Sequence, residues 1–274
     1  MHATFLHDAP AIRFATFLAP NLYCTYEHIA RYVGVKVGYP TRLSVGHSLE
    51  DFVAGQVDVG FICGLPYVRL VDSPGSPVEL LAAPVLRGER YQNKPVYFSD
   101  VIVRSGSLFA SFEDLGGCRW AYNQRTSHSG YNLVYSSLLE LGKTLRYFGT
   151  MIETGSHHLS LQLVLEGQAD AAAIDSHVLD ALLWQNKDLE LQLRVIARLG
   201  PSSIPPVVVA RSLGSNLKCR LQEALITMHD DPVAADGLHK GRIDHFVAVT
   251  DADYNDIRAI FARVQAATSR QVND

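Results

Sequence analysis

The amino-acid sequence predicts an α/β protein with two lobes and a ligand cleft between them. Apolar runs typical of buried strands alternate with segments of helical periodicity along most of the 274 residues. This alternation occurs in two successive blocks, each of which resembles a sheet covered by helices. Short polar residues also gather at strand-to-helix junctions, the places where open α/β sheets bind ligands.

The first block predicts the core of lobe 1. In chain order we expect a strand at 12–19, a helix at 22–34 ending at Gly34, a strand at 41–46, a helix started by Ser48, and a strand at 57–63. Strands linked by helices predict right-handed crossovers and a parallel sheet.

The second block repeats this pattern. We expect a strand at 97–104, a capped turn from Ser111 to Asp114, a strand at 118–123, a helix starting near Gly130, a strand around 148–155, a helix at 157–168 and a strand at 169–175. Further strands follow within 194–211, then a segment at 215–231 and a final helix at 251–267. We therefore predict lobe 1 at 1–98 and 205–274, and lobe 2 at 99–204.

Composition narrows the class of protein. Hydrophobic residues make up 47% of the chain, enough for one large core or two modest ones. The formal charge is −4 and no lysine or arginine cluster stands out, which argues against a nucleic-acid partner. No apolar run approaches the roughly 20 residues that cross a bilayer. The start, "MHATFLHDAPAIRF", lacks the features of a secretion signal, so the chain is either mature and extracytoplasmic or native and cytoplasmic.

Four cysteines are spread along the chain without a C-x-x-C pair: Cys24, Cys63, Cys118 and Cys219. This spacing predicts neither a zinc site nor a thioredoxin-type motif. We interpret them as buried small hydrophobes, although a disulfide between two of them stays open. We expect no metal and no cofactor.

The stretch "NQRTSHSGYN" (123–132) predicts an oxyanion site. Ser127, His128 and Ser129 fall at the N-terminus of a helix, followed by Gly130 and Tyr131. Unpaired backbone N–H groups and the positive end of the helix dipole attract an anion there, and hydroxyls add neutral donors. The alternative is that one serine merely caps the helix.

Other candidates lie at neighbouring junctions. Ser156 and His157 begin the next helix, and Asp175 ends the following strand, where it either contacts a ligand or caps a helix. In lobe 1, we expect pocket residues beyond the ends of two strands: Asn21 and Tyr23 on the loop and first turn after the first strand, and Tyr67 just beyond a later strand.

Several blocks together resemble the phosphonate-binding family of ABC-transporter substrate-binding proteins. They are "AYNQRTSHSGYN", "GSHHLSLQLVLEGQADAAAIDSHVL", "GPSSIPPVVVAR" and "AVTDADYNDIR", and the likeness extends from "RFATFLAPN" to the final helix. The resemblance implies a type 2 periplasmic-binding-protein fold. It also implies that a Ser-Thr-Ser-Gly turn, a histidine after a serine, and tyrosines of lobe 1 hold the phosphonyl oxygens.

Carried over, the turn becomes Ser127 to Gly130, the histidine becomes His157, and one tyrosine becomes Tyr67. His128 stands where the family often has threonine, which replaces a hydroxyl by a titratable ring. Acidic residues that hold the ligand amine in some members have one loose counterpart, Asp175.

The resemblance predicts a non-enzymatic protein that captures a small phosphonate- or phosphate-like anion by hinge closure. If it is secreted, the membrane subunits of an ABC transporter are its partners. The alternative is a cytoplasmic enzyme of the same fold acting on a small anionic metabolite. No catalytic triad, metal-ligand spacing or nucleotide loop is apparent in the sequence to support that alternative.

Overall fold

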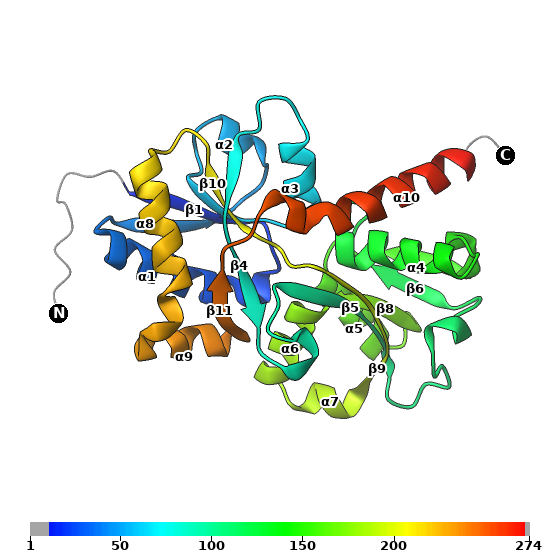
Figure 1. The fold of residues 1–274 in the computed structure, drawn as a ribbon. Coiled ribbons are helices and arrows are strands. Elements are labelled where there is room, and N and C mark those ends of the chain that lie inside the picture. The colour runs from blue at the N-terminus through cyan, green and yellow to red at the C-terminus, as the bar shows by residue number, and fades with distance from the viewer. Residues whose placement is uncertain (1–10, 272–274) are drawn as a thin grey trace. The chain divides into compact units, whose positions relative to one another are not determined.

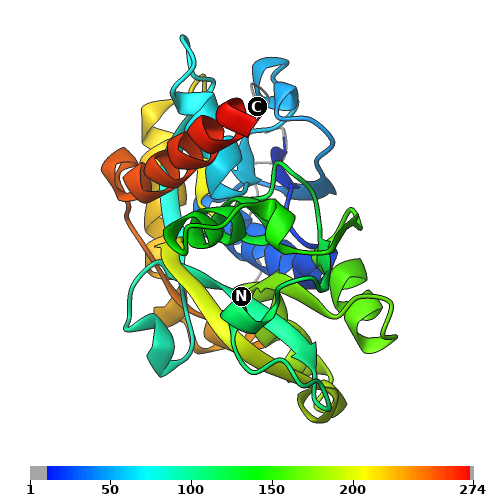
Figure 2. The same cartoon turned by 90° about the vertical axis from the view of Figure 1, so that its right-hand side faces the viewer.

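The structure, a computed structural model, describes residues 11–271 as two α/β units (Figures 1 and 2). Unit 1 contains the described residues up to 96 together with 203–254, and unit 2 contains 97–202 and 255–271. The first ten residues, for which the sequence predicts no leader, lie outside the described range.

Unit 1 is built on a mixed sheet of six strands in the order β11-β4-β10-β3-β1-β2. Its elements, with short helical turns labelled η, are β1 (Ile12–Thr16), η1 (Pro20–Leu22), α1 (Tyr23–Val37), β2 (Thr41–Val45), α2 (Glu50–Val53), β3 (Val59–Phe61), α3 (Gly64–Val71), β4 (Val78–Leu86), η2 (Glu89–Tyr91), β10 (Val207–Ala210), α8 (Ser215–Ile226), η6 (Met228–Asp230), α9 (Pro232–Lys240), β11 (Ile243–Val247) and η7 (Asp251–Tyr254). The predicted parallel pairing holds for β1 with β2 and β3, whereas β10, β4 and β11 run antiparallel.

The end of α1 differs from the prediction. The helix continues through Gly34 to Val37 and ends at Gly38, which adopts a left-handed conformation with φ 74°. Gly34 is small for another reason, because a Cβ there would lie 2.5 Å from Thr41 Cγ2. A glycine that permits close packing was mistaken for a helix stop.

Unit 2 is built on a sheet of five strands in the order β7-β6-β8-β5-β9. Its elements are β5 (Val96–Arg104), η3 (Phe112–Asp114), β6 (Arg119–Tyr122), η4 (His128–Leu133), α4 (Val134–Glu140), η5 (Leu145–Tyr147), β7 (Thr150–Glu153), α5 (His157–Leu165), β8 (Ala171–Asp175), α6 (Ser176–Gln185), α7 (Asp188–Gln192), β9 (Leu193–Ser203) and α10 (Asn255–Gln271). Strand β6 pairs in parallel with β7 and β8, and β5 pairs antiparallel with β8. The predicted capped turn is present, because Ser111 and Asp114 form a reciprocal capping box around η3.

The last helix belongs with unit 2 rather than with the first lobe, where the sequence placed it. Helix α10 packs against η4 and α4 (Figure 1), and the Arg263 guanidinium donates to Ser136 and Glu140 on α4. Helical periodicity reveals an apolar face but not which sheet that face covers.

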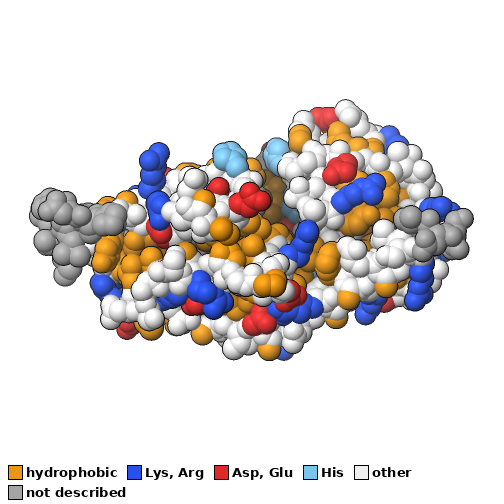
Figure 3. All heavy atoms as spheres, turned by 90° about the horizontal axis from the view of Figure 1, so that it is seen from above, with side chains coloured by type: hydrophobic (Ala, Val, Ile, Leu, Met, Phe, Trp, Pro, Cys, Tyr) orange, Lys and Arg blue, Asp and Glu red, His pale blue; other side chains and the backbone are white. Residues whose placement is uncertain are grey.

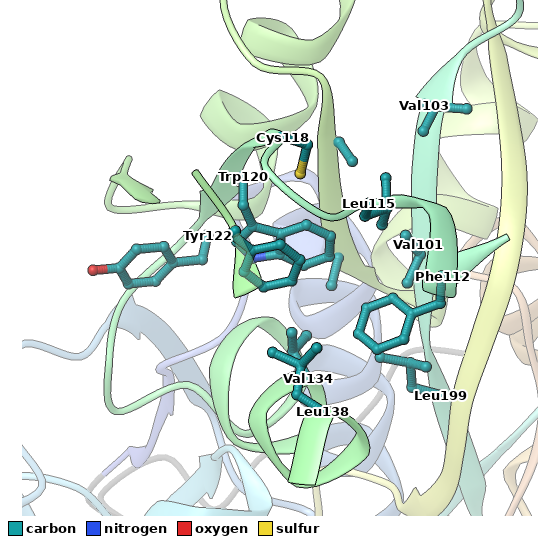
Figure 4. Close-up of a cluster of buried hydrophobic side chains, with 13 residues drawn as sticks. Val101, Val103, Phe112, Leu115, Cys118, Trp120, Tyr122, Val134, Leu138 and Leu199 are labelled. Atoms are coloured by element: carbon teal, nitrogen blue, oxygen red, sulfur yellow. The ribbon is translucent and has the colours of Figure 1, made fainter. Parts of the chain in front are cut away.

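An aromatic core holds β6 in place (Figure 4). The Trp120 ring is fully buried and stacks on Phe148 with centroids 4.4 Å apart, while Phe112 meets both rings edge-on. Alternation along a strand puts Trp120 and Tyr122 on the same side. Because both are anchored, the next residue, Asn123, leaves the sheet at a defined point.

Surface features agree with the composition. Figure 3 shows acidic and basic side chains interspersed over the face in view. Within residues 11–271, no helix has the length and apolarity to span a membrane, and no cluster of metal-binding side chains is found.

All four cysteines are free thiols. Cys118 is buried as predicted, but the prediction is wrong for Cys24 and Cys219, which are exposed because they lie on the outer faces of α1 and α8.

Candidate functional site

Two loops of unit 2 start side by side because β6 and β7 are parallel neighbours. Tyr122 and Glu153, the last residues of these strands, are in register. The loops that follow are then joined by backbone hydrogen bonds, from Thr154 N to Tyr122 O at 2.9 Å and from Gly155 N to Asn123 O at 2.7 Å. The two helices that these loops introduce therefore begin close together.

The first of these helices begins earlier than predicted, at His128 rather than near Gly130. Ser127 is its N-cap, and its Oγ accepts a hydrogen bond from Gly130 N at 3.0 Å. The first turns, η4, are π-helical and continue into α4. A π-helical segment is rare and is frequently found at functional sites.

The second helix, α5, begins with His157. Ser156 is its N-cap and accepts from Leu159 N at 3.1 Å. The His157 Nε2 atom lies 3.0 Å from Ser129 Oγ and 3.4 Å from Asn123 Nδ2. The N-termini of η4 and α5 therefore meet, and we call the five residues at this meeting point, Asn123, Ser127, Ser129, Gly130 and His157, the seat.

Gly130 packs tightly against the Asn123 side chain in the seat. A Cβ at this residue would lie 2.1 Å from Asn123 Oδ1 and 3.4 Å from His157 Cε1. The first distance is far below van der Waals contact, and Asn123 is itself buried. A larger residue would displace the Asn123 side chain, the loop that carries it or the start of η4.

The positive character of the seat comes from backbone groups, because no lysine or arginine among the described residues is buried. Two helix N-termini contribute partial positive charge and N–H donors of the first turn. Burial lowers the pKa of His157 to about 4, so its imidazole is neutral at physiological pH. Within the described residues, Asn123 Oδ1 is buried without a hydrogen-bond partner, whereas the His157 ring bonds the backbone of Ala173. Polar atoms in this state are expected where a ligand supplies the missing contacts.

Arg125 adds a full positive charge near the seat, on the loop between β6 and η4. Its guanidinium is exposed and bonds the Tyr122 hydroxyl, which raises the pKa of Arg125 above its ordinary value. The same hydroxyl donates to Glu153 Oε2 at 3.0 Å. Tyr131 packs beside this group, with its ring centroid 5.5 Å from that of Tyr122.

Two predicted ligand residues of unit 2 have other partners. The His128 ring is fully buried, and its Nε2 lies 2.9 Å from Ser202 Oγ. Asp175 caps α6 by accepting from His177 N at 2.8 Å and Val178 N at 3.4 Å. For Asp175 the structure thus shows the capping alternative.

The unit 1 candidates are engaged within their own unit. Tyr67 follows the end of β3, as predicted, and lies on α3, where its hydroxyl donates to Asp251 Oδ1 at 2.8 Å. The Tyr23 hydroxyl donates to Leu43 O at 3.3 Å, and Asn21 lies in η1. Their contact with a ligand stays a prediction.

Sequence reasoning missed Asn123 and Arg125 as site residues, although both lie in the stretch that predicted the site. The available signal was position, since a polar side chain directly after a buried strand occupies the edge where ligands bind. Ser99 was also missed. Its Oγ donates to Ser129 O at 2.7 Å from the middle of the sheet, and no local pattern in the sequence marks this contact.

Comparison with known proteins places the chain in a family. Residues 15–254 match the model of a family described as the periplasmic substrate-binding protein of a phosphonate ABC transporter. The chain belongs to this phosphonate-binding family. Its membership accounts for the two units with mixed sheets and confirms the resemblance inferred from the sequence blocks.

Solved structures of similar fold include other binding proteins of ABC transporters. A component of an ABC phosphonate transporter from Pseudomonas aeruginosa is 19% identical, with 94% of this chain and 87% of that chain covered and a TM-score of 0.80. PhnD1 from Prochlorococcus marinus, in complex with methylphosphonate, is 15% identical, with coverages of 93% and 98% and a TM-score of 0.80. The alkanesulfonate-binding protein SsuA from Xanthomonas axonopodis, bound to MOPS, is 17% identical, with coverages of 96% and 94% and a TM-score of 0.62.

Acidification is expected to destabilise this phosphonate-binding family member through two desolvated histidines, the buried His128 and the half-buried His157. Burial lowers the pKa of His128 and His157 from 6.5 to about 4. Between these pH values the unfolded chain binds protons that the folded protein does not. The stability that these two histidines contribute is therefore fully present above pH 6.5 and is lost as the pH falls toward 4. For the fully buried His128 the loss is on the order of 3 kcal/mol. Urea unfolding across this range should show a smaller loss for His128→Gln than for the wild type.

Asp175 provides an internal control, because its contribution to stability changes with pH in the opposite direction to that of the histidines. Burial raises the pKa of its carboxyl from 3.8 to about 7, so the folded protein takes up this proton first and gains stability as the pH falls between these values. Asp175→Asn keeps a capping oxygen but removes this gain, and its acid-induced loss should be steeper than that of the wild type. Identical slopes for the wild type and His128→Gln would contradict the histidine argument.

Proposed function

We propose that the seat binds the phosphonyl or phosphate oxygens of a small ligand, and that this is how the protein serves ABC-type uptake. The observation that carries the proposal is the convergence of the N-termini of η4 and α5, with Ser129 Oγ 3.0 Å from His157 Nε2. Helix N-termini are established anion sites because their free N–H groups and dipoles face the ligand.

Neutral donors suit this ligand class. Ser127 Oγ accepts from Gly130 N and still has its own proton to donate. A phosphonate oxygen carries charge but offers several acceptor positions, so hydroxyl and backbone donors can offset its desolvation through charge-assisted hydrogen bonds. The formal charge of −4 does not oppose this, because diffuse surface charge is screened by salt while the donors act at contact distance.

Membership of the family supports an extracytoplasmic binding protein that delivers its ligand to membrane subunits of an ABC transporter. PhnD1 of similar fold was crystallised with methylphosphonate, which makes methylphosphonate the first probe to test. Closure of the two units around a hinge, and contact of Tyr67, Tyr23 or Asn21 with the ligand, remain predictions.

A thermal-shift screen followed by calorimetry tests the proposal. Methylphosphonate, phosphite and phosphate are compared with methanesulfonate and acetate at one salt concentration. A ligand that binds only the folded state raises the melting temperature, by an amount that grows with its concentration relative to Kd. We expect at least one phosphorus oxyanion to give a saturable shift. No shift with any phosphonate, phosphite or phosphate would refute the proposed ligand class.

One observation favours an enzyme as the alternative. Ser129 Oγ and His157 Nε2 have the spacing of a nucleophile and its general base. However, a histidine whose pKa is lowered to about 4 is a weak base, and within the described residues no carboxylate orients its Nδ1 atom. Phosphorus NMR of phosphonates incubated with the protein distinguishes the two, because a binding protein returns its ligand unchanged.

A further inference from the structure

A chain of hydrogen bonds leads from the seat turn to the segments where the polypeptide passes between the units. His128 lies between Ser127 and Ser129, and its Nε2 lies 2.9 Å from Ser202 Oγ. Ser202 Oγ in turn donates to Asp256 Oδ2. All three residues belong to unit 2.

The direction of each bond follows from the number of protons. A serine hydroxyl has one proton, and that of Ser202 is donated to the Asp256 carboxylate. The hydroxyl must therefore accept from His128, so the imidazole carries its hydrogen on Nε2 and is bare at Nδ1. Within the described residues, His128 Nδ1 has no hydrogen-bond partner, which agrees with this tautomer.

Burial makes the hydrogen bonds of His128 and Ser202 costly to lose. The His128 ring is fully buried and Ser202 is 2% exposed, so neither side chain can replace a lost partner with solvent. A histidine in a serine turn could instead contact the ligand. The Nε2 atom of His128 cannot do so, because its ring is fully buried and Nε2 is bonded to Ser202. A second contact fixes the same turn, because Ser99 Oγ donates to Ser129 O.

The hydrogen bonds from His128 end at residues next to the boundaries between the units. Ser202 is the last residue of unit 2 before the polypeptide passes to unit 1, and Asp256 is the second residue after it returns. The passages themselves are joined, since Ser203 Oγ donates to Asp253 O in unit 1. His128 thus connects the turn that carries Ser127 and Ser129 to two of the points where the chain changes unit.

We propose that His128 is a positioning residue, which sets the orientation of the seat turn through Ser202 and Asp256 and links ligand binding there to the backbone at both passages. Such a link is reciprocal: the factor by which the ligand favours the ordered passages equals the factor by which ordered passages strengthen ligand binding. This inference rests on the proposed function only in taking a phosphorus oxyanion as the ligand of the seat.

The central variant is His128→Leu, which removes the donor but keeps an apolar side chain, and the rescue variant is His128→Gln, which restores an N–H donor. Ser202→Ala breaks the same link from the other side. The matched control is His158→Leu, since His158 is an exposed histidine of the same unit. Each variant is measured by hydrogen exchange without ligand and by calorimetry with methylphosphonate.

We expect faster exchange of the 128–132 amides in His128→Leu and Ser202→Ala, and methylphosphonate binding weakened roughly tenfold, the effect of one lost buried hydrogen bond. His128→Gln and His158→Leu should resemble the wild type. The double variant His128→Leu with Ser202→Ala should be no weaker than either single one, because both break one chain. In the wild type, methylphosphonate should slow exchange at 202–204 and 255–257, and His128→Leu should abolish that slowing.

The inference is overturned if folded His128→Leu binds as the wild type does, if His128→Gln is as weak as His128→Leu, or if the two single effects add. Should His128→Leu not fold, Ser202→Ala decides by the same readings. If the wild type binds no phosphorus oxyanion, the proposed function fails, while unchanged exchange at 128–132 in Ser202→Ala without ligand would separately refute the anchoring role.

Discussion

Replacing Ser127 and Ser129 together by alanine is expected to weaken methylphosphonate binding by a few kcal/mol, roughly a hundredfold or more in Kd. Ser127 is the N-cap of the helix that begins at His128, and Ser129 in its first turn has its Oγ 3.0 Å from His157 Nε2. Ligand oxygens brought to the altered seat would lose their hydroxyl partners while still losing water. Titration calorimetry of the double variant against the wild type measures the change.

This variant also loses a helix cap, so a control is needed. Ser127 Oγ accepts from Gly130 N, and its removal should cost about 1 kcal/mol of stability on its own. Thr144→Ala removes a similar cap, because Thr144 Oγ1 accepts from Arg146 N at the start of η5. If the double variant binds methylphosphonate with the wild-type Kd, the seat does not hold the ligand.

Gly130→Ala is expected to abolish measurable binding and to destabilise unit 2. The new methyl group would overlap Asn123 Oδ1 at 2.1 Å, and overpacking of this kind costs about 1–3 kcal/mol. Relief of the overlap must turn the Asn123 side chain or move its loop or the start of η4, and each of these changes displaces a seat residue. Urea unfolding measures the stability, and calorimetry with methylphosphonate measures the binding.

The matched control is Gly106→Ala in the same unit. A Cβ at Gly106 meets no atom within 4 Å, and its backbone is not left-handed, so neither stability nor binding should change. Wild-type behaviour of Gly130→Ala would show that η4 and the Asn123 loop move apart freely. The packing of Gly130 against Asn123 would then not position the seat.

Local patterns in the sequence predicted much of unit 2 correctly. Strand β6, the helix formed by η4 and α4, strand β7 and helix α5 all occur in the predicted order. The signals that predict these elements are periodicity, turn residues and helix caps. Such signals arise from residues within a few positions of one another. The same patterns placed Ser127 and Ser156 at helix starts, where the structure shows them as N-caps.

Errors appeared where the deciding contact is distant in sequence. His128 looked like a ligand donor because it stands within a serine turn, yet its partner Ser202 lies 74 residues away. Asp175 was ambiguous between a cap and a ligand residue, since both roles begin at the end of a strand. The antiparallel strands β4, β10 and β11 were not predicted as such, because a strand's own pattern does not reveal the direction of its neighbour.

The sequence by itself determined the family, the order of most elements of unit 2 and the two helix starts that supply the seat, because caps and periodicities act over a few residues. Only the tertiary structure decided which atoms meet there: Gly130 against Asn123, His157 beside Ser129, and His128 turned toward Ser202. These contacts depend on parallel strand pairing and on core packing around Trp120, which bring together residues that no local pattern connects.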